Sequence, residues 1–199
     1  MTRRWFALLA LIATAGMLAA PPRAAAQSDP VGFINNLGVQ AIQVLGPSVA
    51  PAARTQRFRE LFGADFDLPG IGRFVLGRYW RVATPEQQQQ FLGLLREYLA
   101  QAYAGRLAQY AGEKFQALNA QPQGDETIVS SQILRNDGGK INVQWHLVNN
   151  GGWKITDAYV AGVSMAVTER DEFASVIQQG GGQISYLLDR LRQKVGTAQ

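Results

Sequence analysis

The sequence has no cysteine and only one histidine, His146, among its 199 residues. Without cysteine the chain can form no disulfide, thiolate nucleophile, iron–sulfur cluster or cysteine-type zinc site. A single histidine also argues against a histidine-based metal site and against a histidine-centred triad. We therefore expect no metal and no cofactor, and much of enzyme chemistry is excluded.

Charged residues make up only 17% of the chain. Hydrophobic residues make up 47%, and nine Phe, six Tyr and four Trp are available to build a core. This composition is typical of a globular protein and not of a disordered chain. The length predicts one domain, alone or with a tail.

The first 26 residues have the organisation of an export signal. Arg3 and Arg4 form a positive start, an apolar run follows over residues 5–20, and small residues lead up to Ala26. The run is shorter than the ~20 apolar residues that a spanning helix needs. We predict a signal peptide cleaved near Ala26 and a single domain over residues 27–199. The two arginines also resemble a twin-arginine motif, so general secretion and twin-arginine export both stay open.

Cleavage at this point would remove most of the apparent positive charge. The chain has 19 basic and 15 acidic residues, and three of the basic residues, Arg3, Arg4 and Arg23, lie in the signal. The remaining chain then has sixteen basic and fifteen acidic residues, so its net charge is close to zero. Because nucleic-acid binding needs a clustered basic surface, we expect none here.

The first half of the remaining chain has helical spacing. A helix is predicted to start at Asp29-Pro30, a second near Pro51 with Phe58 and Phe62 facing inward, and a third over residues 71–80. The longest helix starts at Thr84 with a capping box and proline at its first position. Its apolar face is wide, so it is contacted by several neighbouring helices or by a ligand cavity.

The second half alternates polar and apolar residues with a period of two. The pattern predicts strands over 127–134, 141–147 and 153–165, with hairpin turns at 136–139 and 149–152. In the last strand Trp153, Ile155, Asp157 and Tyr159 are expected to share one face. A helix capped by Thr168 and a final amphipathic helix from Ile184 complete an α+β domain.

Few residues could carry chemistry. His146 lies on the polar side of its strand, and we favour a solvated histidine there. Asp157 lies on the apolar face, where a buried carboxyl could act as a general base, with Tyr159 as its partner in a small enzyme. The alternative, which we favour, is that Asp157 forms an ion pair or backbone cap with an arginine of the segment 71–81.

Several separated motifs stand in unbroken order from about residue 30 to residue 193. The helical half contains Val75-Leu76-Gly77-Arg78-Tyr79-Trp80-Arg81, Thr84-Pro85-Glu86-Gln87, Phe91, Tyr98-Leu99, Tyr103 and Tyr110. The strand half contains Gln144-Trp145, Gly152-Trp153-Lys154, Asp157, Gly162-Val163-Ser164-Met165, Arg170 and Phe173. Together these motifs resemble the MlaC or toluene-tolerance family. At the position before Arg170, where many relatives have an aromatic residue, this chain has Glu169.

The resemblance implies a nuclear-transport-factor-like sheet covered by helices, with acyl chains held between them. It implies a periplasmic carrier without enzymatic activity that moves phospholipid between the outer and inner membranes. Its partners would be an inner-membrane lipid-transport ABC complex and an outer-membrane lipid-transfer lipoprotein. Some relatives are associated with hopanoid metabolism, so a hopanoid or other lipid as cargo stays open, as does a small enzyme of the same fold.

On this basis we predict two groups of site residues. The lipid-contacting residues are expected to be Leu76, Tyr79, Trp80, Phe91, Leu95, Tyr98, Tyr103, Val143, Trp145, Leu147, Ile155, Tyr159 and Val163. The surface that docks to membrane partners is expected to be Arg73, Arg78 and Arg81. The alternative for these arginines is a solvated helix face, with one of them paired to Asp157.

Overall fold

The computed structural model describes residues 29–44 and 49–196. The predicted signal peptide lies outside these residues. No helix within them is both long and apolar enough to cross a membrane. The elements in chain order are α1 (Pro30–Val44), α2 (Pro51–Asp65), α3 (Leu68–Leu76), the 3-10 helix η1 (Gly77–Arg81), α4 (Pro85–Leu107), the 3-10 helix η2 (Ala108–Tyr110), β1 (Lys114–Gln123), β2 (Glu126–Leu134), β3 (Lys140–Asn149), β4 (Trp153–Val160), β5 (Val163–Ser164), α5 (Met165–Gln179) and α6 (Ile184–Gly196).

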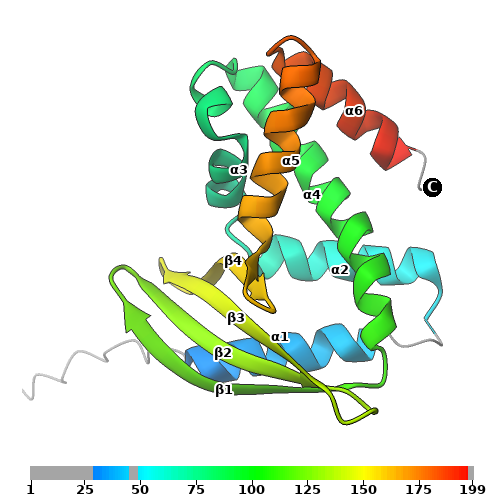
Figure 1. Ribbon diagram of the computed structural model, residues 1–199, viewed down its shortest axis with the longest axis vertical. Coiled ribbons are helices and arrows are strands. Elements are labelled where there is room, and N and C mark those ends of the chain that lie inside the picture. The colour runs from blue at the N-terminus through cyan, green and yellow to red at the C-terminus, as the bar shows by residue number, and fades with distance from the viewer. Residues whose placement is uncertain (1–28, 45–48, 197–199) are drawn as a thin grey trace, which may run out of the picture.

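The strands form one antiparallel sheet in the order β1-β2-β3-β4-β5. Each strand therefore pairs with the next one in the chain, as the hairpin turns predict. The sheet curves, and α1 lies along its inner side (Figure 1). The predicted α+β class is confirmed.

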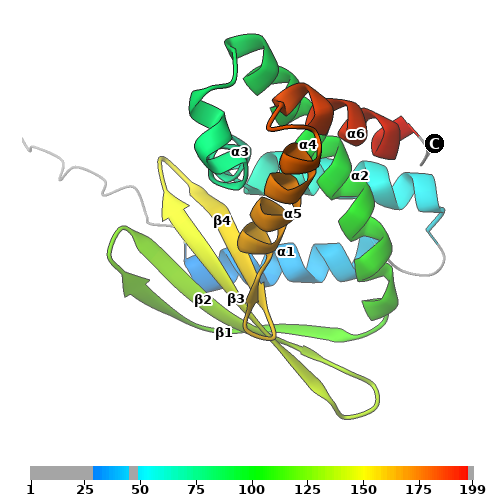
Figure 2. The same cartoon turned by 45° about the horizontal axis from the view of Figure 1, so that its top comes forward.

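Helix α1 packs close against the sheet because it presents a glycine to it. A Cβ at Gly38 would lie only 2.3 Å from the ring of Phe115 on β1, so any side chain there would force the helix away. The helix buries Ile34 and Leu37 against Val129 of the sheet. Figure 2 shows α1 lying inside the curve of the strands. This contact forms the smaller of two apolar clusters.

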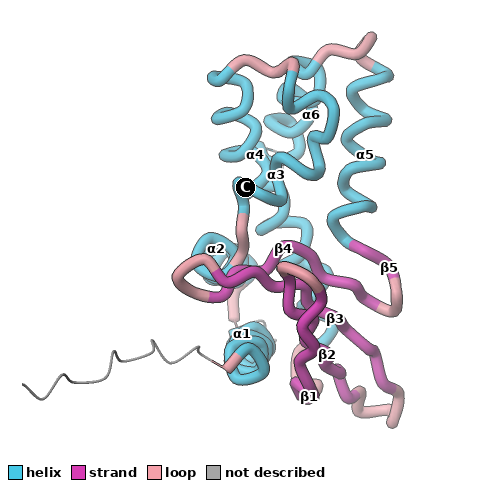
Figure 3. Tube along the Cα trace, turned by 90° about the vertical axis from the view of Figure 1, so that its left-hand side faces the viewer, coloured by secondary structure: helices cyan, strands magenta, loops and turns pink. Residues whose placement is uncertain are grey.

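The larger cluster lies among α2 to α6, away from α1 (Figure 3). Helix α4 is its centre and starts with the predicted capping box, in which Thr84 and Gln87 satisfy each other's backbone amides. Phe91 and Leu95 of α4 are fully buried, and Phe91 meets Phe173 of α5 edge to face at 5.8 Å. The wide apolar face of α4 is therefore covered by several elements, as its sequence predicts.

The last predicted strand, 153–165, is wrong in two respects. A bulge at Thr156 shifts the register, because His146 pairs with Asp157 whereas Leu147 pairs with Ile155. The extra residue reverses the alternation, so the inward-facing residues are Trp153 and Ile155 before the bulge and Ala158 and Val160 after it. The shared face expected from Trp153 to Tyr159 does not form.

The second error concerns the end of this strand. The chain turns at Ala161, which has a positive φ of 51°, and returns as the short β5. Helix α5 then starts at Met165, and its cap is Ser164, whose hydroxyl accepts a hydrogen bond from the amide of Val167. Thr168 lies inside the helix and is not its cap. Its hydroxyl bonds back to the carbonyl of Ser164 instead.

Candidate functional site

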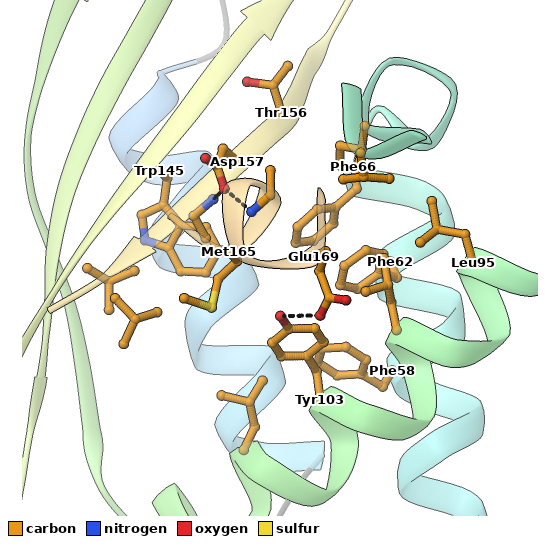
Figure 4. A pocket seen from close by; sticks show the side chains of 18 of the residues that line it. Phe58, Phe62, Phe66, Leu95, Tyr103, Trp145, Thr156, Asp157, Met165 and Glu169 are labelled. Carbon is orange, nitrogen blue, oxygen red and sulfur yellow. Dashed lines mark hydrogen bonds between the residues drawn. The ribbon is translucent and has the colours of Figure 1, made fainter. Parts of the chain in front are cut away.

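An apolar cavity lies where α2, α4 and α5 meet the inner face of the sheet (Figure 4). The volume of this cavity is about 150 Å³. The lining residues are Phe58, Phe62, Phe66, Ile71, Val75, Leu95, Leu99, Tyr103, Leu107, Tyr110, Ile133, Val143, Trp145, Thr156, Asp157, Ala158, Val160, Met165, Ala166 and Glu169. Because its lining is predominantly apolar, the cavity suits apolar ligands.

Aromatic rings form one wall of the cavity. Phe62 stacks on Phe66 with ring centroids 3.9 Å apart, and Phe58 lies 5.5 Å from Phe62. On the sheet side, the indole of Trp145 donates a hydrogen bond to the hydroxyl of Ser131 at 2.8 Å. Because that bond satisfies its polar atom, the rest of the indole ring is available as apolar surface.

Glu169 places a carboxyl group in this apolar wall. It lies on the second turn of α5 and is only 5% exposed. Its Oε1 accepts a hydrogen bond from the hydroxyl of Tyr103 at 3.2 Å (Figure 4). Burial raises the pKa of Glu169 above its ordinary value of 4.5, and the nearby charge of Glu172 raises it further, although Tyr103 and Arg106 act in the opposite direction. This carboxyl therefore holds its proton to a higher pH than an ordinary glutamate does.

The two tyrosines beside this carboxyl respond in the same way. Burial, and then the charge of Glu169, raises the pKa of Tyr98 to about 12. The pKa of Tyr103 is also raised, for the same two reasons. Both phenols thus stay protonated, and the hydroxyl of Tyr103 donates to Glu169.

Replacing Glu169 by Gln is expected to stabilise the protein at neutral pH and to change little near pH 4. A raised pKa means that the folded protein holds the proton more tightly than the unfolded chain. The contribution of Glu169 to stability is therefore complete below its ordinary pKa and is lost as the pH rises through the raised value, whereas Gln does not titrate. Melting temperatures across a pH series measure the difference, at roughly 2–4 °C per kcal/mol for a chain of this size.

The matched control for this prediction is Asp171→Asn, which removes a carboxylate from an exposed position of the same helix. We expect its melting temperature to follow that of the unchanged protein at every pH. A stability difference for Glu169→Gln that does not vary with pH would contradict the raised pKa.

Asp157, the other carboxyl at the cavity, has a structural role. Its oxygens accept hydrogen bonds from the hydroxyl of Ser164 and from the amide of Ala166, which is an otherwise unpaired donor in the first turn of α5. The predicted backbone cap is thus present, but its partner is a helix start and not an arginine. A carboxylate at this end also suits the helix dipole.

Asp157 and Tyr159, the residues of the enzyme alternative, form no hydrogen bond with each other among the described residues. Tyr159 alternates with the cavity residues Ala158 and Val160 and so lies on the outer face of the sheet. Its ring stacks on His146 there, with centroids 4.7 Å apart. His146 in turn bonds to Glu126 through Nδ1 at 2.9 Å, so it is partly buried and paired, not simply solvated as predicted.

Comparison with known proteins agrees with this architecture. A sequence model of the family described as MlaC protein matches residues 41–193, about three quarters of the chain. The chain belongs to the MlaC family.

Two named proteins are similar in sequence to this chain. The chain is 29% identical to the toluene tolerance protein ttg2D of Pseudomonas putida over 151 residues, which cover 74% of this chain and 70% of that protein. It is 22% identical to the intermembrane phospholipid transport system binding protein MlaC of Haemophilus influenzae, over 96% of this chain and 92% of that one.

A solved structure has the same fold. The phospholipid-binding protein from Ralstonia solanacearum, determined in complex with a phospholipid, superposes with a TM-score of 0.71. The match covers 86% of this chain and 99% of that chain at 23% sequence identity. The fold of this chain is therefore shared along nearly the whole of that protein.

Four of the residues that the resemblance to the MlaC family singled out do line the cavity. Leu95 and Tyr103 come from α4, and Val143 and Trp145 come from β3. Figure 4 shows Trp145 on the sheet side of the cavity and Leu95 and Tyr103 on the side of α4. That these four residues contact lipid stays a prediction.

The other predicted lipid contacts lie outside the cavity wall. Their positions follow from packing among the helices and from the bulge in β4. Leu76, Tyr79, Trp80, Phe91 and Tyr98 pack into the cluster among the helices; Leu147 and Ile155 are buried beneath α1; Tyr159 is on the outer face of the sheet; and Val163 is 54% exposed on β5.

Sequence reasoning missed much of the helical wall of the cavity. Phe58 and Phe62 were expected to face inward, but nothing in the period of α2 distinguishes a core contact from a cavity contact. Glu169 was noted only because an aromatic residue is common at this position among relatives. A charged residue within the apolar stripe of a helix is the signal that could have indicated it.

Proposed function

We propose that this protein is a periplasmic phospholipid-binding shuttle that carries lipid between the outer and inner membranes for an ABC-type lipid-transport system. The observation that carries the proposal is the apolar cavity between α4 and the sheet, in a chain of the MlaC family. Relatives named for intermembrane phospholipid transport and for phospholipid binding support it. The proposal includes no enzymatic step.

A carrier of this kind needs a cavity about as apolar as a membrane. Moving one methylene from water into an apolar site gains about 0.8 kcal/mol, so two chains of roughly sixteen carbons would gain about 25 kcal/mol, beyond the practical limit of affinity. When the chains come from a bilayer instead of from water, this gain in free energy is close to zero, because they leave one apolar environment for another. Loading and release are then both possible, because the cavity offers the chains an environment similar to the one they leave.

The size of the cavity indicates that it adapts to its cargo. A space of about 150 Å³ suits a ligand the size of benzene, which is less than a full acyl chain. Met165 also lines the cavity, and long unbranched side chains of this kind repack readily. We propose that α2, α4 and α5 separate from the sheet as acyl chains enter.

Native mass spectrometry of the protein purified without detergent tests the proposal. We expect the mature chain to carry an added mass that matches a phospholipid, and organic extraction to remove it. A hopanoid would give a different mass and would change the cargo but keep the carrier function. A protein that retains no lipid, and takes none up from vesicles, would contradict the proposal.

We also propose that Arg73, Arg78 and Arg81 dock the protein to its membrane partners. All three are exposed, on α3 and η1. Arg78 lies 4.9 Å above the ring of Tyr79 and donates a hydrogen bond to its hydroxyl, so it is held in place. Phe74, which follows Arg73 on α3, is 42% exposed, and the guanidinium of Arg170 lies 5.1 Å from its ring. A fixed cation next to an aromatic ring is typical of binding surfaces.

Charge reversal at two of these positions, Arg73→Glu with Arg78→Glu, is expected to slow lipid transfer to the inner-membrane complex by about tenfold or more. Lipid already bound should stay bound, because neither side chain lines the cavity. Transfer between proteoliposomes that contain the complex measures the first effect, and native mass spectrometry measures the second. Reversal at Arg190 and Arg192 of α6 is the control. Equal transfer rates for both variants would place docking elsewhere.

A further inference from the structure

The cavity wall contains a polar atom that the described part of the chain leaves without a hydrogen-bond partner, Oε2 of Glu169. The other oxygen of the same carboxyl accepts from Tyr103, so the group is oriented. An unsatisfied buried polar atom costs about 1–3 kcal/mol and calls for an explanation in a native protein. In a cavity that takes a ligand, the ligand itself can supply the missing partner.

The protonation of Glu169 decides which partner is needed. Glu169 is only 5% exposed, and none of the ion pairs among the described residues includes it, so an ionised carboxylate here would be buried without a counter-charge. Burial also raises its pKa, and the site therefore suits the neutral acid. A carboxylic acid has one carbonyl oxygen that accepts and one hydroxyl that donates. Because the hydroxyl of Tyr103 already donates to Oε1, the proton belongs on Oε2. The free position therefore needs a hydrogen-bond acceptor.

The surroundings of Glu169 restrict the chemistry of that acceptor. The carboxyl lies among the rings of Phe58, Phe62 and Tyr103, so the groups on either side of the acceptor must be apolar (Figure 4). An anionic acceptor is disfavoured, because Glu172 lies close enough to raise the pKa of Glu169 and Asp157 also lines the cavity. The acceptor is thus an uncharged oxygen within an apolar molecule.

We propose that Glu169, oriented by Tyr103, donates a hydrogen bond to an acyl ester carbonyl of the bound lipid, and that this contact selects ester-linked over ether-linked glycerolipids. The carbonyl of an acyl ester is uncharged, accepts hydrogen bonds strongly and is attached directly to a hydrocarbon chain. An ether linkage of the same length lacks this oxygen and would leave Glu169 unsatisfied. The inference rests on the proposed carrier function and adds a specificity to it.

The test offers the protein two lipids that differ only in linkage. Vesicles contain equal amounts of dipalmitoyl diester and dihexadecyl diether phosphatidylcholine, and native mass spectrometry counts the two complexes. We expect about a tenfold preference for the diester, the effect of one hydrogen bond. Glu169→Leu should abolish the preference while retaining lipid, whereas Glu169→Gln should keep most of it, because its amide still donates. Asp171→Asn, at an exposed position of the same helix outside the cavity wall, is the control and should keep all of it.

Each outcome is decisive. An unchanged protein that loads both lipids equally, or a Glu169→Leu variant that still prefers the diester, would overturn the assignment and leave the carrier function intact. An unchanged protein that loads neither lipid would instead overturn the carrier function. If Glu169→Leu does not fold, Tyr103→Phe replaces it. This variant removes the group that orients the acid, and we expect the preference to fall several-fold, whereas an undiminished preference would count against the proposal.

Discussion

Replacing Val143 by Glu is expected to abolish lipid retention. Val143 is 4% exposed and faces the cavity from β3, opposite the residues of α4. A carboxylate at this position would be buried without a partner among apolar side chains, and acyl chains would have to pack against it. We expect the complex with lipid, measured by native mass spectrometry at neutral pH, to fall below a tenth of its level in the unchanged protein.

The neighbouring position provides the matched control. Gln144→Glu adds the same charge to the same strand, but its side chain is exposed on the outer face of the sheet. This variant should retain lipid fully. Because Val143→Glu can also weaken folding, circular dichroism must accompany the assay, and Val143→Phe fills the cavity without a charge. Full lipid retention by a folded Val143→Glu protein would show that acyl chains bind elsewhere.

Replacing Phe91 by Ala is expected to cause a large loss of stability but little loss of lipid per folded molecule. Phe91 is fully buried and packs against Phe173, outside the cavity wall. Removing a buried phenylalanine costs about 3–5 kcal/mol, which corresponds to a fall in melting temperature of roughly 10 °C. Thermal unfolding measures this loss, and native mass spectrometry of the folded fraction measures bound lipid.

The control for Phe91→Ala is Val163→Ala. Val163 was also expected to contact lipid, but it is exposed on β5, so its truncation should change stability by less than about 0.5 kcal/mol. Both variants should bind lipid as the unchanged protein does. If Phe91→Ala keeps its melting temperature and loses lipid, then Phe91 is a cargo contact, as the resemblance to relatives implies.

Local chemistry predicted most of the elements. The capping box at Thr84, the proline starts at Pro30 and Pro51, and the turn residues at 136–139 and 149–152 each act over a few residues, so a sequence pattern can indicate them. The inward side of α2 was predicted correctly for the same reason: Phe58 and Phe62 are both buried. These features depend little on what packs against them.

The positions that were mispredicted depend on tertiary structure. The bulge at Thr156 is one extra residue in β4, and no pattern marks it, because both faces of this strand carry large side chains. Without the bulge Tyr159 would have faced inward, as predicted. Likewise, whether a buried residue such as Leu95 or Phe91 meets a cavity or a neighbour depends on the space between elements, and periodicity reports only which side of the helix is covered.

The two apolar clusters of the fold meet around the cavity, where Phe66 packs against both. A ligand in that space therefore joins the helical part of the molecule to the part built on α1 and the sheet. We expect unfolding to be more cooperative with lipid bound than without it, since the cargo completes a continuous core. In the proposed carrier, delivery would leave the protein with a divided interior, and the unloaded form would be the one most exposed to local opening and to proteolysis before it loads again.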